Sequence, residues 1–597
     1  MSESTAAERG ERATGPRAQE AVREQDRAAR PPRPPWWRVP LIATGAVVPL
    51  YAVWVVALAT GGGDLAAQFA WAGFMARHPG SAYNLSWYGG THTANYSVLA
   101  PPLMAVLGVR TASVLAGLAG SWALGLLLVR TGVRRAVWPA LLGSVALWCN
   151  VASGRTTFAL GAAIGLFALL ATLGPRTSLP RASLPRTSLP RSGRLRTATL
   201  VSAWLLAASA TLASPVAGLF LVVVGAAYLL DRQWVNGAAL VVPPFLVVAA
   251  TTLFFPFEGE QPMSPGKLWM PLVTCAALCL AAPRSWRVVR YGAFVYAAGV
   301  VLTFSVSSPI GTNVERLVGL AGPPVLLAAL LTRGPGPLRT PRAPARPSRP
   351  SRPSRAVVLP LVLLVTVCVN TYWLLSKTED DLVVSTTVPA WAAHTEGVVA
   401  ALDRLGADRT RVEVVPARNH READVLAPYV NMARGWNRQL DVERGRLFYD
   451  GGRGARTLDP AAYRAWLDRW AVGLVVLPHG KPDSPAAAEA AVVADGPQWL
   501  TPVWRDSHWT VYRVRDAVPL VTRPAEVVRS DAASMVVRME AAGSVTVRIA
   551  YSPWLRAPGA CVTRAGDWIR LTAPAAGEYR LDSAYRLPGA GASGCRD

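Results

Sequence analysis

Eleven stretches of this 597-residue sequence are apolar enough to form membrane-spanning helices, and this feature constrains the fold more than any other. The first stretch, residues 39–60, has about 20 mainly apolar residues, enough for one helix to cross the roughly 30 Å hydrocarbon core of a bilayer. The other ten lie near 112–129, 137–152, 157–174, 198–212, 214–231, 236–256, 268–283, 289–306, 316–332 and 357–376. The predicted fold class is therefore an α-helical polytopic membrane protein with about 11 spans.

The segments that connect these stretches alternate in charge. The loops 175–197 and 333–356 are rich in arginine, whereas 61–111, 257–267 and 307–315 contain few basic residues. Lys and Arg collect in cytoplasmic loops. With an odd number of spans, the alternation predicts a protein of the cell membrane with a cytoplasmic N-terminus and an extracytoplasmic C-terminal region.

A further apolar segment, residues 97–109, is too short to span and would break the alternation. We expect it to be a re-entrant or interfacial piece.

The formal net charge of +24 belongs mostly to the basic loops. Their arginines alternate with Pro and Ser instead of lining a folded face with stacking aromatics, which argues against nucleic-acid binding. We interpret the Arg-Pro-Ser repeats as topogenic charge on flexible linkers. Binding of anionic membrane lipids is the alternative.

Composition and periodicity divide the chain into four regions. Residues 1–38 have almost no large aliphatic side chains and lack a signal-peptide pattern, which predicts a disordered cytoplasmic tail. Residues 39–376 are predicted to form the membrane domain. Residues 377–524 mix helical and strand-like patterns and predict an extracytoplasmic α/β domain. Residues 525–597 alternate apolar and polar side chains and predict a small extracytoplasmic β-sandwich.

Individual elements can be expected within the α/β region. They are a helix near 396–405, a strand at 411–415, a helix at 460–470, a buried strand at 473–478 and a pair of strands through 502–514.

The six cysteines divide between the membrane and C-terminal regions. Four lie inside predicted spans, where a lone thiol usually acts as a small apolar side chain: Cys149, Cys275, Cys279 and Cys368. Cys561 and Cys595 lie in the predicted β-domain, in an oxidising compartment, and we predict a disulfide between them.

The loop after the first span begins with Asp64. From residue 65 to 76 the apolar side chains recur at helical spacing, which predicts an amphipathic helix on the outer membrane surface. Asp directly before a helix is a good N-cap. A capping role and a chemical role therefore both stay open for Asp64.

This loop opens with GGGDLAAQFAW and ends with WYGGTHTANYSVLAPP. In this arrangement the chain resembles the GT-C class of integral-membrane glycosyltransferases, and the later segments GRTTFALGAAIGLFALLA and SSPIGTNVERL are similar to outer loops of that class. The resemblance covers about 40–376. The segment VEVVPARNHREADVLAPYVNMARGWNRQLD also resembles the outer domain of actinobacterial multispan proteins. The resemblance implies a GT-C-like fold that uses polyprenyl-phosphate sugars outside the membrane.

The resemblance also implies roles for particular residues. Asp64 corresponds to the acidic residue that serves as the base or as a metal-linked acceptor binder. Arg155 is the candidate for holding the donor phosphate, because a guanidinium can grip two phosphate oxygens in its fork. Arg316, His78 and Asn313 are further candidates for substrate binding.

Two of these assignments have alternatives. Arg155 can also be interpreted as an interfacial anchor, and Arg316 can simply pair with the adjacent Glu315. Many members of the class have two acidic residues in the first outer loop, whereas this loop has only Asp64. This departure weighs against a divalent metal, and no metal ligand is assigned.

The sequence thus predicts a membrane enzyme, a glycosyltransferase that moves a sugar from a polyprenyl-phosphate donor to a cell-envelope glycan acceptor in cell-wall biogenesis. The alternatives are a secondary transporter and a non-catalytic envelope-assembly protein. An odd span count without evident inverted halves argues against the transporter. Five aromatic residues of the C-terminal region are candidates for stacking on sugar rings: Tyr429, Trp436, Trp504, Trp509 and Trp554.

Overall fold

The computed structural model describes residues 35–94, 96–173, 189–257, 259–333, 355–450 and 453–585. Most of the predicted tail, much of the two Pro-rich basic loops and Cys595 lie outside these described residues. From residue 39 onward the chain forms one compact unit. The predicted division of this unit at 376 and 524 stays a prediction.

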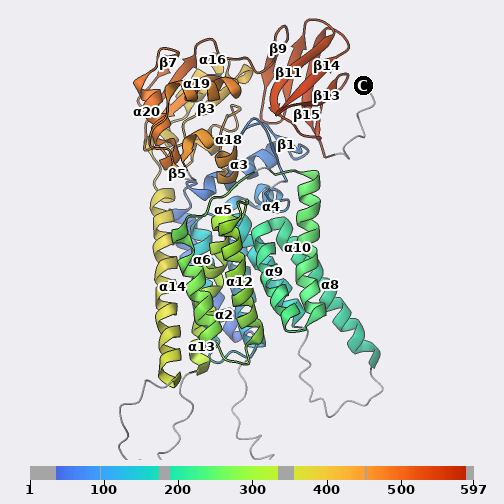
Figure 1. Ribbon diagram of the computed structural model, residues 1–597, viewed down its shortest axis with the longest axis vertical. Coiled ribbons are helices and arrows are strands. Elements are labelled where there is room, and N and C mark those ends of the chain that lie inside the picture. The colour runs from blue at the N-terminus through green and yellow to red at the C-terminus, as the bar shows by residue number, and fades with distance from the viewer. Residues whose placement is uncertain are drawn as a thin grey trace, which may run out of the picture. The chain divides into compact units, whose positions relative to one another are not determined.

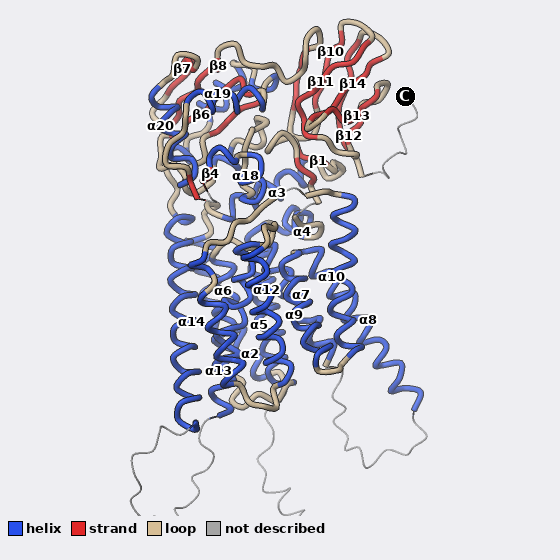
Figure 2. The backbone as a smooth tube through the Cα atoms, in the orientation of Figure 1, coloured by secondary structure: helices blue, strands red, loops and turns tan. Residues whose placement is uncertain are grey.

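Helices dominate the described part of the chain up to residue 386, as Figures 1 and 2 show. They are α2 (Arg38–Val53, continued by the π-helical turn Trp54–Leu58), α3 (Asp64–Arg77), α4 (Ala100–Leu107), α5 (Val109–Arg130), α6 (Val137–Ala152), α7 (Thr156–Thr172), α8 (Leu189–Ala213), α9 (Pro215–Leu230), α10 (Trp234–Phe254), α11 (Trp269–Ala281), α12 (Arg287–Ser305), α13 (Glu315–Arg333) and α14 (Arg355–Thr386).

Each of the eleven predicted apolar stretches coincides for most of its length with one of these helices. In the described residues, seven helical segments are long and apolar enough to cross a membrane: those containing α2, α5, α8, α10, α12, α13 and α14. The apolar helices α6, α7, α9 and α11 are shorter. At 1.5 Å per residue, a 16-residue helix such as α6 reaches only about 24 Å. A helical membrane protein is supported, while the count of 11 spans stays a prediction.

The segment 97–109 contains the eight-residue helix α4. Pro101 and Pro102 lie in its first turn, and Gly108, at φ +80°, separates it from α5. The amide of Val98 just before the helix donates to the carbonyl of Leu212, 2.8 Å away. The segment is therefore a short helix held against α8, and its depth in a membrane stays a prediction.

Helix α3 forms where the sequence predicts it, but it does not simply lie on a surface. It packs against α4 and against α17 (Glu422–Val425) of the C-terminal region. Leu65, Ala66 and Phe74 are buried, and so is the polar side chain of Gln68. A helix covered by protein on several sides can place polar side chains in an enclosed site.

The predicted α/β region contains a four-stranded sheet in the order β3-β6-β8-β7. Its elements are α15 (Ala390–Ala393), α16 (Glu396–Arg404), β3 (Arg411–Val414), α17, α18 (Arg438–Arg444), β4 (Tyr449–Asp450), β5 (Arg453–Gly454), α19 (Pro460–Arg469), β6 (Val472–Pro478), α20 (Ala487–Asp495), β7 (Leu500–Arg505) and β8 (Trp509–Val514). Strands β3 and β6 are parallel, and β6, β8 and β7 are antiparallel. The almost uninterrupted apolar run of β6 is buried because both faces of the strand pack in apolar clusters, Leu474 and Val476 in one and Val472 and Val475 in the other. The elements expected from the sequence are all present.

The predicted C-terminal β-sheets are present as well. The strands are β9 (Glu526–Ser530), β10 (Met535–Met539), β11 (Gly543–Ala550), β12 (Leu555–Arg556), β13 (Cys561–Ala565), β14 (Trp568–Ala573) and β15 (Gly577–Ser583). They form the sheets β12-β15-β10-β9 and β11-β14-β13. Alternate apolar side chains from both sheets, such as Val537 and Leu571, share one core.

The cysteines differ between these regions. Cys149, Cys275, Cys279 and Cys368 are free thiols, as expected for small apolar residues of spans. Cys561 is disulfide-bonded. Its predicted partner Cys595 lies outside the described residues, so the pairing stays a prediction.

The loop between α3 and α4 belongs to the core of the C-terminal region. The Trp87 indole donates to the carbonyl of Ala423 at 3.1 Å, and the Tyr83 hydroxyl donates to the carbonyl of Ala550 at 2.8 Å. Its short strands β1 (Tyr83–Asn84) and β2 (Thr91–His92) pair with each other. The aromatic residues of this loop therefore fix the C-terminal region to the start of the helical part.

The contact between α3 and α17 contains a carboxyl group with a shifted pKa. Burial raises the pKa of Asp424 from 3.8 to about 7, against the opposing charges of Arg77 and Arg421. Between these two values the folded chain keeps a proton that the unfolded chain has released. Stability therefore falls as pH rises from about 4 to 7, by at most about 4 kcal/mol from this group.

We expect Asp424→Asn to remove this part of the pH dependence. The measurement is thermal unfolding of the full chain in nanodiscs from pH 5 to 8. Relative to Asp424→Asn, the wild type should lose stability as the pH rises. If the stability of the two proteins changed with pH in parallel, Asp424 would have the same pKa in the folded and the unfolded chain.

Candidate active site

A cavity of about 920 Å³ lies where the helical part meets the C-terminal region. Four of the five predicted substrate-site residues line it: Asp64, Arg155, Asn313 and Arg316. They come from α3, the start of α7, the 3₁₀ turn Gly311–Val314 and α13. The cavity is also lined by Lys267, Glu315, Lys377, Asp381 and Arg438. The fold thus brings residues more than 200 positions apart to one enclosed space.

Asp64 lies in the first turn of α3 but does not cap it. The N-cap residue is Gly63, and no side chain makes the cap hydrogen bond. The preceding glycines are held tightly: a Cβ on Gly62 would lie 2.6 Å from the Ser385 carbonyl oxygen, and the Arg421 guanidinium donates to that same oxygen. The Asp64 carboxylate therefore lines the cavity without capping the helix, and 37% of its side chain is exposed.

Arg155 lies opposite Asp64, directly before the first residue of α7. Its Nε is 3.6 Å from Asp64 Oδ2. Gly154 makes this approach possible, because its φ is +78° and a Cβ there would lie 2.8 Å from the backbone nitrogen of Leu65. The start of α7 and the start of α3 consequently touch through backbone atoms.

A second carboxylate, missed in the sequence, completes this cluster. Asp381 Oδ2 accepts a hydrogen bond from Arg155 Nη2 at 2.9 Å. Helix α14 continues past residue 376, the predicted end of the span, to Thr386, and this extension carries both Lys377 and Asp381. Their spacing of four residues puts them on one helix face, a signal that the sequence KTEDD already contained.

The proposed local pair of Glu315 with Arg316 does not form. Glu315 pairs instead with Lys377 of α14. The Arg316 guanidinium lies over the Phe158 ring, 5.4 Å from its centroid, and makes no ion pair within the described residues. Neighbours on a helix point about 100° apart, so Glu315 and Arg316 face different partners. Arg316 keeps a positive charge at the cavity wall.

His78 does not line the cavity. It follows the last residue of α3, and its ring lies 5.2 Å from that of Phe74. Burial lowers the pKa of His78, although Asp531 opposes this shift. The structure therefore does not bring His78 to the candidate site.

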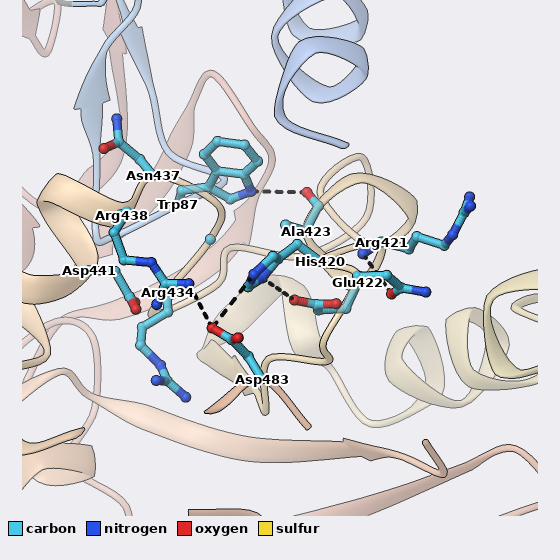
Figure 3. Close-up of polar contacts among 12 residues, drawn as sticks. Trp87, His420, Arg421, Glu422, Ala423, Arg434, Asn437, Arg438, Asp441 and Asp483 are labelled. Carbon is cyan, nitrogen blue, oxygen red and sulfur yellow. Dashed lines mark hydrogen bonds and ion pairs between the residues drawn. The ribbon is translucent and has the colours of Figure 1, made fainter. Parts of the chain in front are cut away.

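The C-terminal region contributes Arg438 to the cavity, and Figure 3 shows how this side chain is held. Its Nη2 donates to Asp483 Oδ2 at 2.8 Å, and its Nη1 donates to the Tyr449 hydroxyl at 2.7 Å. Burial alone would raise the pKa of Asp483, but the charges of His420 and Arg438 outweigh burial and lower it. Asp483 is thus ionised and fixes the Arg438 fork. Nothing in the sequence distinguished Arg438 from the many other arginines as a candidate site residue.

The donor set does not fit a resident divalent ion. Among the described residues, no group of three or more His, Cys, Asp or Glu side chains has a metal-binding arrangement. Asp64 and Asp381 both face the Arg155 guanidinium, which already supplies positive charge between the two carboxylates.

The five candidate sugar-stacking aromatics have different environments. Trp509 is fully buried in the core, and Trp504 packs against the same core. Trp554 stacks on Phe255 at 5.0 Å, and Tyr429 is 58% exposed away from the cavity residues. Trp436 alone among them borders a recess beside the cavity.

Comparisons with known proteins add little about activity. A family model described as a domain of unknown function (DUF8823) matches residues 522–561. A crystal structure of ArnT from Cupriavidus metallidurans bound to undecaprenyl phosphate is similar at 16% identity, with a TM-score of 0.35 over 79% of this chain and 98% of that chain. No curated protein sequence matches this chain. The function therefore has to be argued from the candidate site itself.

Proposed function

We propose that this protein is a membrane glycosyltransferase of GT-C type. It moves a sugar from a polyprenyl-phosphate donor to a cell-envelope glycan acceptor at the extracytoplasmic face. The observation that supports this most is the convergence of Asp64, Arg155, Arg316 and Asn313 on one cavity. These four residues come from three separate segments of the sequence, at positions 64, 155 and 313–316.

In the proposed reaction Asp64 is the general base. A hydroxyl oxygen of the acceptor attacks the anomeric carbon of the donor sugar, and the Asp64 carboxylate takes the hydroxyl proton. The bond between the anomeric carbon and the phosphate oxygen breaks, and its electron pair leaves with the polyprenyl phosphate. The products are the glycosylated acceptor and polyprenyl phosphate.

The basic residues of the cavity would stabilise the leaving group. The donor phosphodiester carries one negative charge, and the released phosphate gains another as the bond breaks. Arg316 and Lys267 have no carboxylate partner within the described ion pairs, so their charge is available to that phosphate. Charge placed in advance where negative charge develops lowers the barrier.

The first experiment is sugar transfer by the wild type in nanodiscs, from synthetic undecaprenyl-phosphate sugars to glycan acceptors. Transfer by the folded protein supports the proposal. No transfer from any polyprenyl donor would instead favour the non-catalytic envelope-assembly protein.

We further propose that Arg155 holds the donor phosphate, and Arg155→Lys tests this role within the same assay. Lysine keeps the charge but loses the two-pronged fork. We expect the KM for the donor to rise at least about 10-fold, with a smaller change in the KM for the acceptor. An equal rise in both KM values would mean that Arg155 only orders the site through Asp64 and Asp381.

A further inference from the structure

A smaller recess of about 230 Å³ adjoins the cavity. Six residues line both spaces: Asp64, Arg155, Thr312, Asn313, Arg316 and Arg438. We call the smaller space the aromatic–amide recess, defined by Gln68, Trp71, Tyr96, Gln261, Trp436 and Asn437. It is smaller than the roughly 300–1,000 Å³ of sites for drug-sized ligands. Its size therefore suits a ligand of one or two rings.

Aromatic rings form one wall of the aromatic–amide recess. The rings of Trp71 and Tyr96 have centroids 5.1 Å apart and an interplanar angle of 34°, and both side chains are only partly buried. Trp436 is braced from behind, because its ring stacks on His420 with centroids 3.4 Å apart. The negative faces of such rings attract the weakly positive C–H groups on the flat side of a sugar ring.

Several amide side chains line the recess beside the arginines that it shares with the cavity, and Gln68 is the most informative of these amides. It lies one helical turn after Asp64 on α3, so both side chains occupy the same helix face. Only 4% of Gln68 is exposed, yet its Oε1 has no hydrogen-bond partner within the described residues. A buried acceptor without a donor costs free energy. A ligand hydroxyl would supply the missing donor.

The segment of the C-terminal region that borders the recess is held rigidly. The Tyr88 hydroxyl donates to the Gly435 carbonyl at 2.9 Å and accepts from the Asn437 amide at 3.1 Å. Asn437 in turn caps α18. Figure 3 shows Asn437 and Arg438, with the Arg438 side chain joined to Asp483, which His420 also contacts. The recess thus has preformed walls from both parts of the chain.

We propose that the aromatic–amide recess binds a sugar ring of the acceptor and orients its hydroxyl toward Asp64. This inference rests on the proposed glycosyltransferase function and adds the location of the acceptor. The donor carries a phosphate as well as a sugar and suits the larger cavity, which has about 920 Å³ against about 230 Å³ for the recess. Lys267, which forms no ion pair within the described residues, lines only that cavity. Asp64 borders both spaces, as a base between donor and acceptor must. The C-terminal region would accordingly help to select the acceptor.

The test is direct binding of neutral sugars to the full chain in nanodiscs. Methyl α- and β-glycosides of glucose, galactose, mannose and arabinose are the probes, and saturation-transfer NMR is the readout. Wild type should bind at least one glycoside, and undecaprenyl phosphate, which has no sugar, should leave that binding in place. Gln68→Met and Trp71→Leu should each weaken it at least about 5-fold. Tyr429→Ala, an exposed aromatic outside the recess, is the control and should bind as wild type.

Three results would overturn the inference: no glycoside binding by folded wild type, binding that survives both recess variants, or displacement by undecaprenyl phosphate. Thermal unfolding confirms that each variant is folded, and the two variants change different side chains in case one fails. Transfer is measured separately. Glycoside binding without any sugar transfer would contradict the proposed glycosyltransferase function but not sugar binding in the recess. An unchanged KM for the acceptor in folded Gln68→Met would contradict acceptor binding in the recess but not the glycosyltransferase function.

Discussion

Asp64→Asn is expected to lower the rate of sugar transfer at least about 100-fold while the protein stays folded. Asparagine has nearly the same size but cannot accept the proton of the acceptor hydroxyl. The structure removes the main structural objection, because Gly63 and not Asp64 occupies the N-cap position of α3. The measurement is transfer from a synthetic undecaprenyl-phosphate sugar in nanodiscs, with thermal stability recorded for each variant.

Asp380→Asn is the matched control for this experiment. It is the same substitution one residue before Asp381, at an exposed position that does not line the cavity. The control should transfer sugar at the wild-type rate. Full activity in Asp64→Asn would exclude this carboxylate as the base. The candidate base would then be Asp381, the other carboxylate that pairs with Arg155.

Arg434→Met is expected to destabilise the C-terminal region by about 3–5 kcal/mol. Arg434 is buried between Glu413 and Glu489, both fully buried carboxylates, and it ion-pairs with both. Burial raises the pKa of Glu413, and the positive charge of Arg434 opposes that shift. Without the arginine, two carboxylates remain in an apolar core with no counter-charge. The readout is the tryptophan-fluorescence unfolding transition of the full chain.

The pH dependence of this effect has a definite sign. At low pH the two glutamates can take up protons, so the loss of stability in Arg434→Met should be larger at pH 8 than at pH 5. Arg538→Met is the control, because Arg538 also contacts two carboxylates, Glu526 and Glu578, but on an exposed sheet surface. Solvent screens such pairs. Equal destabilisation by both substitutions would contradict the buried-charge explanation.

The helices and most of the strands could be predicted because their signals are local. A run of apolar residues such as 357–376 must form a helix in lipid, where every backbone N–H and C=O needs a partner within its own segment. The β-strand Val472–Pro478 is likewise recognisable from its own apolar side chains. The end of α14 was missed, because the polar residues after 376 are stabilised in a helix by contacts with distant segments and not by membrane insertion.

The candidate site was only half predictable. Four site residues are recognisable in the sequence because they are polar and lie at the ends of apolar stretches, where few other polar residues occur: Asp64, Arg155, Asn313 and Arg316. Asp381 and Arg438 do not stand out, since they belong to polar segments with many charges. Only the fold shows that these two face the same cavity.

The sequence by itself thus determined most of the segments that form helices or strands, because backbone hydrogen bonding and burial act over neighbouring residues, and it indicated polar residues as candidates for a site. Which side chains contact each other was decided by the tertiary structure alone. Arg155 approaches Asp64 only because Gly154 allows backbone contact between α7 and α3. Glu315 pairs with Lys377 and not with the adjacent Arg316. Such choices depend on how helices pack, and packing is set by side-chain shapes hundreds of residues apart.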